Sequence, residues 1–253
     1  MMAILETRGL TKEFGGLRAL DEVDISVDEG ELVSLIGPNG SGKSTLINTI
    51  TGRLEPTEGD VHYNGEDIVG LAPNEIAQRG VGRTFQTASI FPERTVRENI
   101  EIAAHASEVG SFKMNFLRRR DSFDEVLDRT ERVLETIELD DQGEMEAQSL
   151  PYGDKRRLEV AIGLATGPDL MFMDEPTAGM SPGETAMTVE LIERLRDELG
   201  MTIFLVEHDM DVIFGISDRV FVLNEGALIA EGPPSEIRES EIVRRAYLGS
   251  ETV

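Results

Sequence analysis

The chain has 253 residues, no cysteine, and 49 acidic against 24 basic side chains, which gives a formal net charge of −25. This balance disfavours a nucleic-acid partner, and the lack of cysteine excludes disulfides and thiolate metal sites. No apolar run approaches the ~18 residues of a membrane span, and the N-terminus lacks a basic segment followed by an apolar one, so we expect a cytosolic chain. Because the acidic residues are scattered, we interpret them as adaptation to molar salt, where a Debye length of ~3 Å screens repulsion.

The N-terminal third alternates between strands and one glycine-rich loop. Alternating apolar stretches at 3–5, 23–27 and 60–63 predict antiparallel strands, and hence a β-rich lobe. Between them, the apolar run 31–36 predicts a buried strand, and residues 44–50 can form a helix that begins directly after the loop.

That loop reads GPNGSGKST and fits the spacing G-x-x-x-x-G-K-[ST] of a triphosphate-binding loop. Glycine lets backbone N–H groups approach phosphate oxygens, a lysine can reach the β- and γ-phosphates, and a serine hydroxyl can be a Mg²⁺ ligand. We therefore predict an ATP site with Mg²⁺, formed by Gly37, Pro38, Asn39, Gly40, Ser41, Gly42, Lys43, Ser44 and Thr45. Lys43 also belongs to the predicted catalytic set.

The rest of the chain turns helical and then alternates. Helical apolar spacing appears at 73–77, 96–106 and 123–137, so the middle third is predicted to be a helical insert. The subsequent order is helix 154–165, strand 170–173, helix 183–199 and strands 202–206 and 219–223. This βαβ alternation predicts a parallel sheet with helices on its faces.

An acidic pair ends the predicted strand at 170–173. Asp174 is placed to hold Mg²⁺, directly or through water, and Glu175 to deprotonate the water that attacks the γ-phosphate. Two carboxylates before Pro176 could also begin an ordinary surface turn, but the upstream phosphate loop favours the catalytic interpretation.

Three further motifs lie between and after the phosphate loop and the acidic pair. Gln86 follows a strand in GRTFQ, LPYGDKRRL occupies 150–158, and His208 ends the apolar strand of TIFLVEHD. Together with the phosphate loop and the acidic pair, this order resembles the ATPase subunits of ABC transporters over essentially the whole chain. The resemblance implies an α/β fold, a P-loop NTPase cassette with a mainly parallel sheet, an N-terminal antiparallel β lobe and a helical subdomain. We expect one ABC domain over 1–253, with a core at about 1–85 and 168–253 and a helical insert at about 86–167.

Finer motifs resemble the larger ATPase of branched-chain amino acid (LIV-type) importers. They are FGGLRAL, IAQRGVGRTFQ, RRLE, VEHDMDVIFGISDRVFVLNEG and the ending AYLG. Urea importers, which tend toward lysine where this chain has Thr84, and lipopolysaccharide-export ATPases rank behind. With its acidic surface, the chain is expected to come from a haloarchaeon.

The resemblance also implies roles and partners. Two ATPase subunits close face to face on two ATP molecules, each held by one phosphate loop and the opposite LSGGQ-like signature, here Tyr152 and Gly153. Phe14 is expected to stack on adenine, although it could instead be a core residue of its strand. Gln86 is expected to bind or sense Mg²⁺ and the attacking water, and His208 to hydrogen-bond the γ-phosphate. Permease subunits, a second ATPase and, indirectly, an extracellular solute-binding protein are the implied partners, at the cytoplasmic face of the membrane.

Departures and alternatives remain. The signature carries Pro151 and Asp154 where the family usually has a small residue and glutamine, and Ser181 replaces a usual aspartate or asparagine. We expect Asp154 to be exposed and to place negative charge near the nucleotide, which would weaken this signature.

A soluble ABC ATPase that moves no substrate usually has two cassettes or a long coiled coil, and a degenerate regulator would lack Glu175 or His208; neither description fits this sequence.

Overall fold

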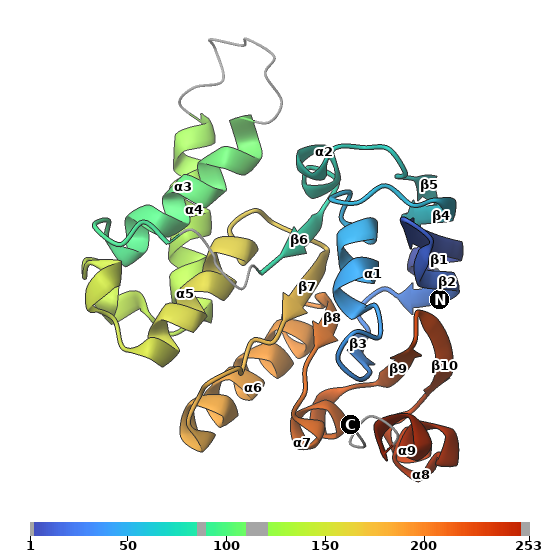
Figure 1. Cartoon of the computed structure of the whole chain (residues 1–253). Coiled ribbons are helices and arrows are strands. Elements are labelled where there is room, and N and C mark those ends of the chain that lie inside the picture. Colours follow the sequence, from blue (N-terminus) through green and yellow to red (C-terminus); the bar gives the residue numbers. More distant parts are fainter. Residues whose placement is uncertain (1–2, 85–89, 110–120, 249–253) are drawn as a thin grey trace. The chain divides into compact units, whose positions relative to one another are not determined.

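The computed structural model describes residues 3–84, 90–109 and 121–248. Contacts divide the chain into two compact units, which are 1–76 with 195–253 (unit 1) and 77–194 (unit 2). Their elements can be followed by colour in Figure 1. No helix in the described part of the chain combines the length and apolar character needed to cross a bilayer.

Unit 1 contains an antiparallel sheet made of the N-terminal strands. Its order is β2-β1-β4-β5, formed by β1 (Ala3–Phe14), β2 (Leu17–Asp28), β4 (Glu58–Tyr63) and β5 (Glu66–Asp67). Alternation along β2 buries Val23, Ile25 and Val27 and leaves the intervening residues more exposed, as expected of a sheet with one buried face. The predicted antiparallel β lobe is therefore confirmed.

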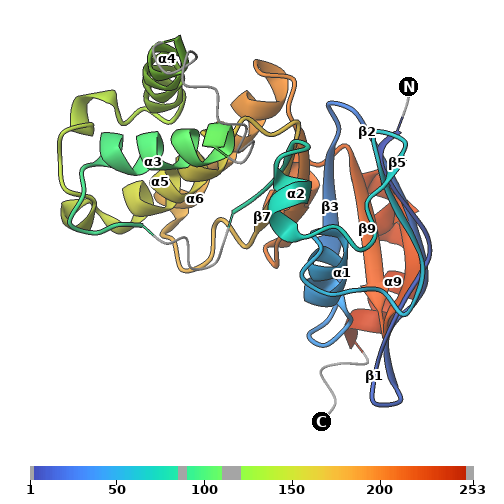
Figure 2. The same ribbon diagram turned by 90° about the horizontal axis from the view of Figure 1, so that it is seen from above.

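The second sheet of unit 1 supports the phosphate loop. In it β10 (Ala227–Gly232), β9 (Arg219–Asn224), β3 (Leu32–Ile36) and β8 (Thr202–Val206) are neighbours in that order. β3 is parallel to both β8 and β9, and all five of its residues are buried, which explains its continuous apolar run. Helix α1 (Lys43–Ile50) lies beside β3 in Figures 1 and 2. The remaining helices here are α7 (Met210–Ile216), α8 (Pro234–Glu239) and α9 (Glu241–Leu248).

Arg219 connects strands of both sheets in unit 1. Its guanidinium donates to the Glu31 carboxylate at 2.8 and 2.7 Å and to the Ser26 carbonyl of β2 at 2.6 Å, and it also pairs with Glu231 of β10. The hydrogen bonds to Glu31 raise the pKa of Arg219 further above its ordinary value. Arg219 is the first residue of β9. Its charge-assisted hydrogen bonds to several oxygens therefore hold the beginning of this strand in place.

Unit 2 combines a pair of parallel strands with helices. Strand β6 (Val81–Arg83) runs parallel to β7 (Leu170–Asp174), with Arg83 opposite Phe172. Helices α3 (Val96–Val109), α4 (Asp121–Thr136) and α5 (Tyr152–Leu164) contact one another and gather as one group in Figure 1. Helix α2 (Pro73–Ala77) lies at the boundary of the two units, and α6 (Pro182–Asp197) begins in unit 2 and ends in unit 1.

Candidate functional site

The glycines of the phosphate loop have contrasting surroundings. A Cβ atom on Gly37 would lie 2.0 Å from the Leu223 carbonyl oxygen, and one on Gly42 would lie 2.6 Å from the Ala19 carbonyl oxygen. Gly40, by contrast, has a φ of 79° and open space around the position of a Cβ. Both ends of the loop are therefore packed against backbone, while its middle faces an opening where a ligand can approach the N–H groups.

Two side chains of the loop point to an anionic ligand. The Ser41 hydroxyl oxygen is buried, and it has no hydrogen-bond partner among the described residues. Lys43 is largely buried, and its Nζ donates to the carbonyls of Gly37 at 2.6 Å and Pro38 at 3.1 Å. Because buried polar groups are normally satisfied, a hydroxyl beside a cationic amino group in an open glycine loop fits a phosphate.

The other predicted loop residues occupy positions that suit the same ligand. Asn39 and Ser44 are exposed, Pro38 and Thr45 are partly buried, and Ser44 and Thr45 lie in the first turn of α1. The N-terminus of a helix favours anions because its first N–H groups lack intrahelical partners. The whole predicted loop is thus assembled in unit 1.

The end of β8 brings His208 to the same edge of the sheet. Leu35 of β3 lies opposite Val206 of β8 in parallel register, so the loops after both strands leave from one edge. His208 is exposed, and its backbone N–H donates to the buried Glu207 carboxylate at 3.1 Å. Asp209 caps α7 by accepting from the N–H of Asp211 at 2.9 Å. These two acidic neighbours, which the sequence analysis did not single out, anchor the backbone on both sides of His208.

Phe14 lies at the end of β1 and is 44% exposed. The alternative that Phe14 is a core residue is therefore wrong. The Lys12 amino group lies 5.2 Å from the centroid of its ring, a distance at which a cation and an aromatic face attract. An exposed aromatic side chain of this kind can stack on a planar base.

In unit 2, the carboxylate of Asp174 is paired with an arginine. Asp174 ends β7, and its Oδ2 lies 3.4 Å from a guanidinium nitrogen of Arg83, with side-chain exposures of 12% and 13%. Glu175, the next residue, has a left-handed φ of 51°. A non-glycine residue in this conformation is strained and often marks a functional site, and this strain is invisible in the sequence.

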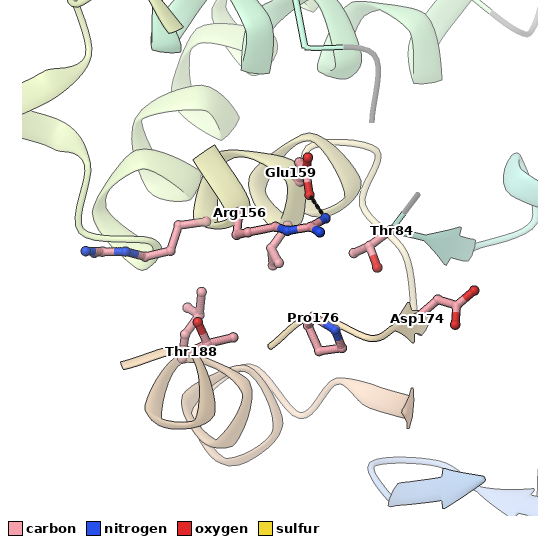
Figure 3. Close-up of a pocket in the computed structure, with 9 residues that line it drawn as sticks. Thr84, Arg156, Glu159, Asp174, Pro176 and Thr188 are labelled. Atoms are coloured by element: carbon pink, nitrogen blue, oxygen red, sulfur yellow. Dashed lines mark hydrogen bonds and ion pairs between the residues drawn. The ribbon is translucent and has the colours of Figure 1, made fainter. Parts of the chain in front are cut away.

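A small cavity of about 10 Å³ lies beside Asp174. Figure 3 shows Thr84, Asp174 and Pro176 on one side of it and Arg156 and Glu159 of α5 on the other. Arg156 donates to Glu159 at 2.7 Å. Burial raises the pKa of Glu159, and the hydrogen bond from Arg156 opposes that rise. The positive charge of Arg156 thus offsets the desolvation of the Glu159 carboxylate near the end of β7.

The signature segment begins α5. Pro151 is its N-cap residue, a position whose N–H would have no helical partner. The Tyr152 hydroxyl donates to the Ala178 carbonyl at 3.0 Å. Gly153 hydrogen-bonds through its backbone to Glu184, whose carboxylate also accepts from the Ser181 hydroxyl at 2.7 Å. Glu184 therefore connects the signature glycine to the first turn of α6, and these hydrogen bonds, chiefly those from Ser181, lower its pKa.

One expectation about the signature is corrected by the structure. Asp154 was expected to be exposed, but its side chain is 14% exposed and lies 2.8 Å from the Arg157 guanidinium. The negative charge is thus neutralised one turn along the same helix, which removes much of the predicted repulsion of a nucleotide. Ser181 has a structural explanation as well, since with Glu184 it forms a capping box for α6.

The predicted residues thus fall into two groups. Unit 1 contains the phosphate loop, Phe14 and His208, and unit 2 contains Asp174, Glu175 and the signature residues Tyr152 and Gly153. Gln86 lies outside the described residues. No group of three or more His, Cys, Asp or Glu side chains suited to a metal occurs in the described ranges. The oxygen donors Ser44 and Asp174 nevertheless have the chemistry that Mg²⁺ prefers.

The sequence analysis assigned no role to Arg83, Glu184 or the acidic neighbours of His208. Arg83 stood in a quoted motif, GRTFQ, so its position was available as a signal. Its pairing with Asp174 depends on the register of β6 and β7, which no spacing in the sequence reveals.

Comparison with known proteins decides the family. The family described as ABC transporter matches residues 20–178, and the family described as branched-chain amino acid ATP-binding cassette transporter matches residues 227–253. The chain belongs to the ABC transporter family. The predicted cassette fold and ATPase class are confirmed at this level.

Relatives and solved structures agree over the full length of the cassette. The LivG protein of Salmonella typhimurium, a high-affinity branched-chain amino acid transport ATP-binding protein, is 45% identical over 97% of this chain and 98% of its own. BraF of Pseudomonas aeruginosa, of the same description, is 42% identical over the same shares, and a probable LivG of Archaeoglobus fulgidus is 37% identical over 99% and 97%. The ADP conformation of an ATP-binding cassette of an ABC transporter matches with a TM-score of 0.86 and 34% identity, covering 98% of this ABC cassette and 100% of that chain.

Proposed function

We propose that this ABC protein is the ATP-hydrolysing subunit of a membrane importer for branched-chain or other hydrophobic amino acids. The observation that carries the proposal is the open glycine loop at the end of β3, with its buried Ser41 hydroxyl and Lys43, in a chain similar to LivG and BraF from end to end. The loop is the evidence for nucleotide binding, and the similarity to LivG and BraF is the evidence for the class of transported substrate.

ATP lies in the cradle formed by residues 37–45, and Phe14 stacks on its adenine ring. Lys43 turns its ammonium from the loop carbonyls toward the β- and γ-phosphates, where it offsets charge that develops during phosphoryl transfer. His208 donates to the γ-phosphate from the same edge of the sheet.

Ser44, Gln86 and Asp174 are the residues that would hold Mg²⁺, which supplies charge neutralisation of the phosphates. Glu175 takes the proton of the attacking water. Its strained backbone contributes to orienting the carboxylate, since strain of this kind is retained where the surroundings demand one conformation.

The working form is a pair of ATPase subunits on a permease at the cytoplasmic face of the membrane, with a solute-binding protein outside the cell. Tyr152 and Gly153 contact the nucleotide of the opposite subunit. A relative of known structure, 27% identical and with a TM-score of 0.74, is an ATP-binding cassette described as dimeric and bound to ADP and Pi.

Uptake assays test the cargo. In cells that lack this chain, uptake of radiolabelled leucine should be lost, restored by the wild-type chain and not restored by Glu175→Gln. Expression of both forms is compared by immunoblot. Normal leucine uptake in the deletion strain together with loss of urea uptake would refute the amino acid assignment and favour a urea importer.

The acidic surface supports a haloarchaeal origin. The 49 acidic residues include Asp and Glu on most helices, and repulsion among them is screened when salt is molar. The effect of KCl on thermal stability tests this part of the proposal independently of transport.

A further inference from the structure

The hairpin formed by β1 and β2 places the exposed ring of Phe14 close to the phosphate loop. In the antiparallel register of the two strands, Phe14 lies opposite Leu17 and Lys12 lies opposite Leu20. The Leu20 side chain is 3.2 Å from the position that a Cβ atom on Gly42 would occupy. The hairpin therefore packs directly against the loop, and a base whose phosphates occupy the loop can extend toward Phe14.

One face of the Phe14 ring is covered by the side chain of Lys12. The Lys12 ammonium lies over the ring, 5.2 Å from its centroid, which is within the range of a cation–π interaction. The same nitrogen donates a hydrogen bond to the Glu55 carbonyl at 2.6 Å, and this bond fixes it above the ring. A base cannot stack on a face that an ammonium occupies, so the opposite face of this 44% exposed ring is the one open to adenine.

The carbonyl that holds Lys12 belongs to the segment between α1 and β4, which is joined to β1 by hydrogen bonds of its own. The Thr57 N–H donates to the Thr11 carbonyl at 2.8 Å, and the Thr57 hydroxyl accepts from the Glu13 N–H at 3.0 Å. Neither bond involves the Lys12 side chain. Removal of the ammonium should therefore leave the backbone of this segment and of β1 in place and change only what lies over the Phe14 ring.

We propose that Lys12 is a positioning residue for the base of the nucleotide, because its ammonium holds the Phe14 ring and leaves only the opposite face to adenine. This inference rests on the proposed function, in which the ligand is ATP and its base stacks on Phe14. Because Lys12 acts through the ring, its contribution to affinity depends on two things, a base on the ligand and an aromatic side chain at position 14.

The test measures two equilibrium affinities of the full chain by titration calorimetry, without Mg²⁺ and at a fixed molar concentration of KCl. ATP reports on base and phosphates together, and inorganic tripolyphosphate reports on the phosphates alone. Lys12→Met removes the charge and keeps an unbranched side chain, whereas Lys12→Arg keeps a cation. Arg18→Met is the matched control, because it removes an equal charge from the same hairpin at a side chain that pairs with Glu13 and Asp21. Thermal melts establish that each variant is folded.

For Lys12→Met we expect an ATP affinity lower by about 2- to 5-fold and an unchanged affinity for tripolyphosphate. Lys12→Arg and Arg18→Met should resemble the wild type with both ligands. In a Phe14→Leu background, Lys12→Met should cause no further loss of ATP affinity, because the ring through which it acts is gone.

Unchanged ATP affinity in Lys12→Met overturns the inference, as does an equal loss for ATP and tripolyphosphate, which would indicate a general effect of charge or a displaced loop. An undiminished effect in the Phe14→Leu background also overturns it, since Lys12 would then act without the ring. In each of these cases the wild type still binds ATP, so the proposed function stands. A wild type that binds neither ligand refutes the proposed function itself, and the role of Lys12 with it.

Discussion

Alanine at two glycines of the phosphate loop should separate folding from nucleotide binding. A methyl on Gly37 would stand 2.0 Å from a backbone oxygen, so β9 or the loop must move. Overpacking against a rigid neighbour costs ~3 kcal/mol, at the upper end of its usual range, which for a chain of this size lowers Tm by about 6–12 °C. We expect Gly37→Ala to be the more destabilising of the two.

Gly40→Ala meets a different obstacle. Its φ of 79° is unfavourable for alanine, but no atom lies within 4 Å of the added methyl. The conformational cost is ~1 kcal/mol, or about 2–4 °C in Tm. The methyl would, however, enter the space where phosphates approach the backbone, so ATP affinity should fall by about 5- to 150-fold.

Thermal melts by circular dichroism and ATP-analogue titrations measure both effects. Gly183→Ala is the matched control, because its added methyl meets nothing within 4 Å and it lies in the first turn of α6. It should leave affinity near the wild-type value and Tm at or slightly above it, because alanine at an unobstructed helical position restricts the unfolded chain more than glycine does. A Gly40→Ala variant that binds ATP normally, or a Gly37→Ala variant as stable as the control, would refute the reasoning.

Three further changes probe the site and the surface. Glu175→Gln should reduce ATP hydrolysis by about 10²- to 10⁴-fold and leave ATP binding intact, since it removes only the base; steady-state turnover within a few-fold of the wild type would contradict this. Melting temperature should rise from millimolar to molar KCl, and a flat or falling series would exclude salt adaptation. The pKa of Glu184 is lowered from 4.5, so its stabilisation is present above that pH and lost as pH falls through the folded-state value. The Tm gap between the wild type and Glu184→Gln should therefore shrink in acid, and a gap independent of pH would argue against the carboxylate's role.

Much of the site could be predicted from the sequence because its chemistry depends on local spacing. The phosphate loop needs its glycines, lysine and serine within one short turn, and the apolar runs before Gly37, Asp174 and His208 each end at a candidate site residue. A buried strand that ends in polar residues is a local pattern, so these positions could be named as candidates without knowledge of the fold.

Only the tertiary structure revealed which side chains pair with one another, because spacing along the sequence does not determine those contacts. Pairing of Arg83 with Asp174 depends on the register of β6 and β7, and these two residues lie far apart in the chain. The ion pair of Asp154 with Arg157 spans one helical turn, and its strength depends on how far the fold buries both side chains. The sequence by itself determined which groups are available, and the fold determined which charges are neutralised and which loop residues are held, because those depend on distances between segments.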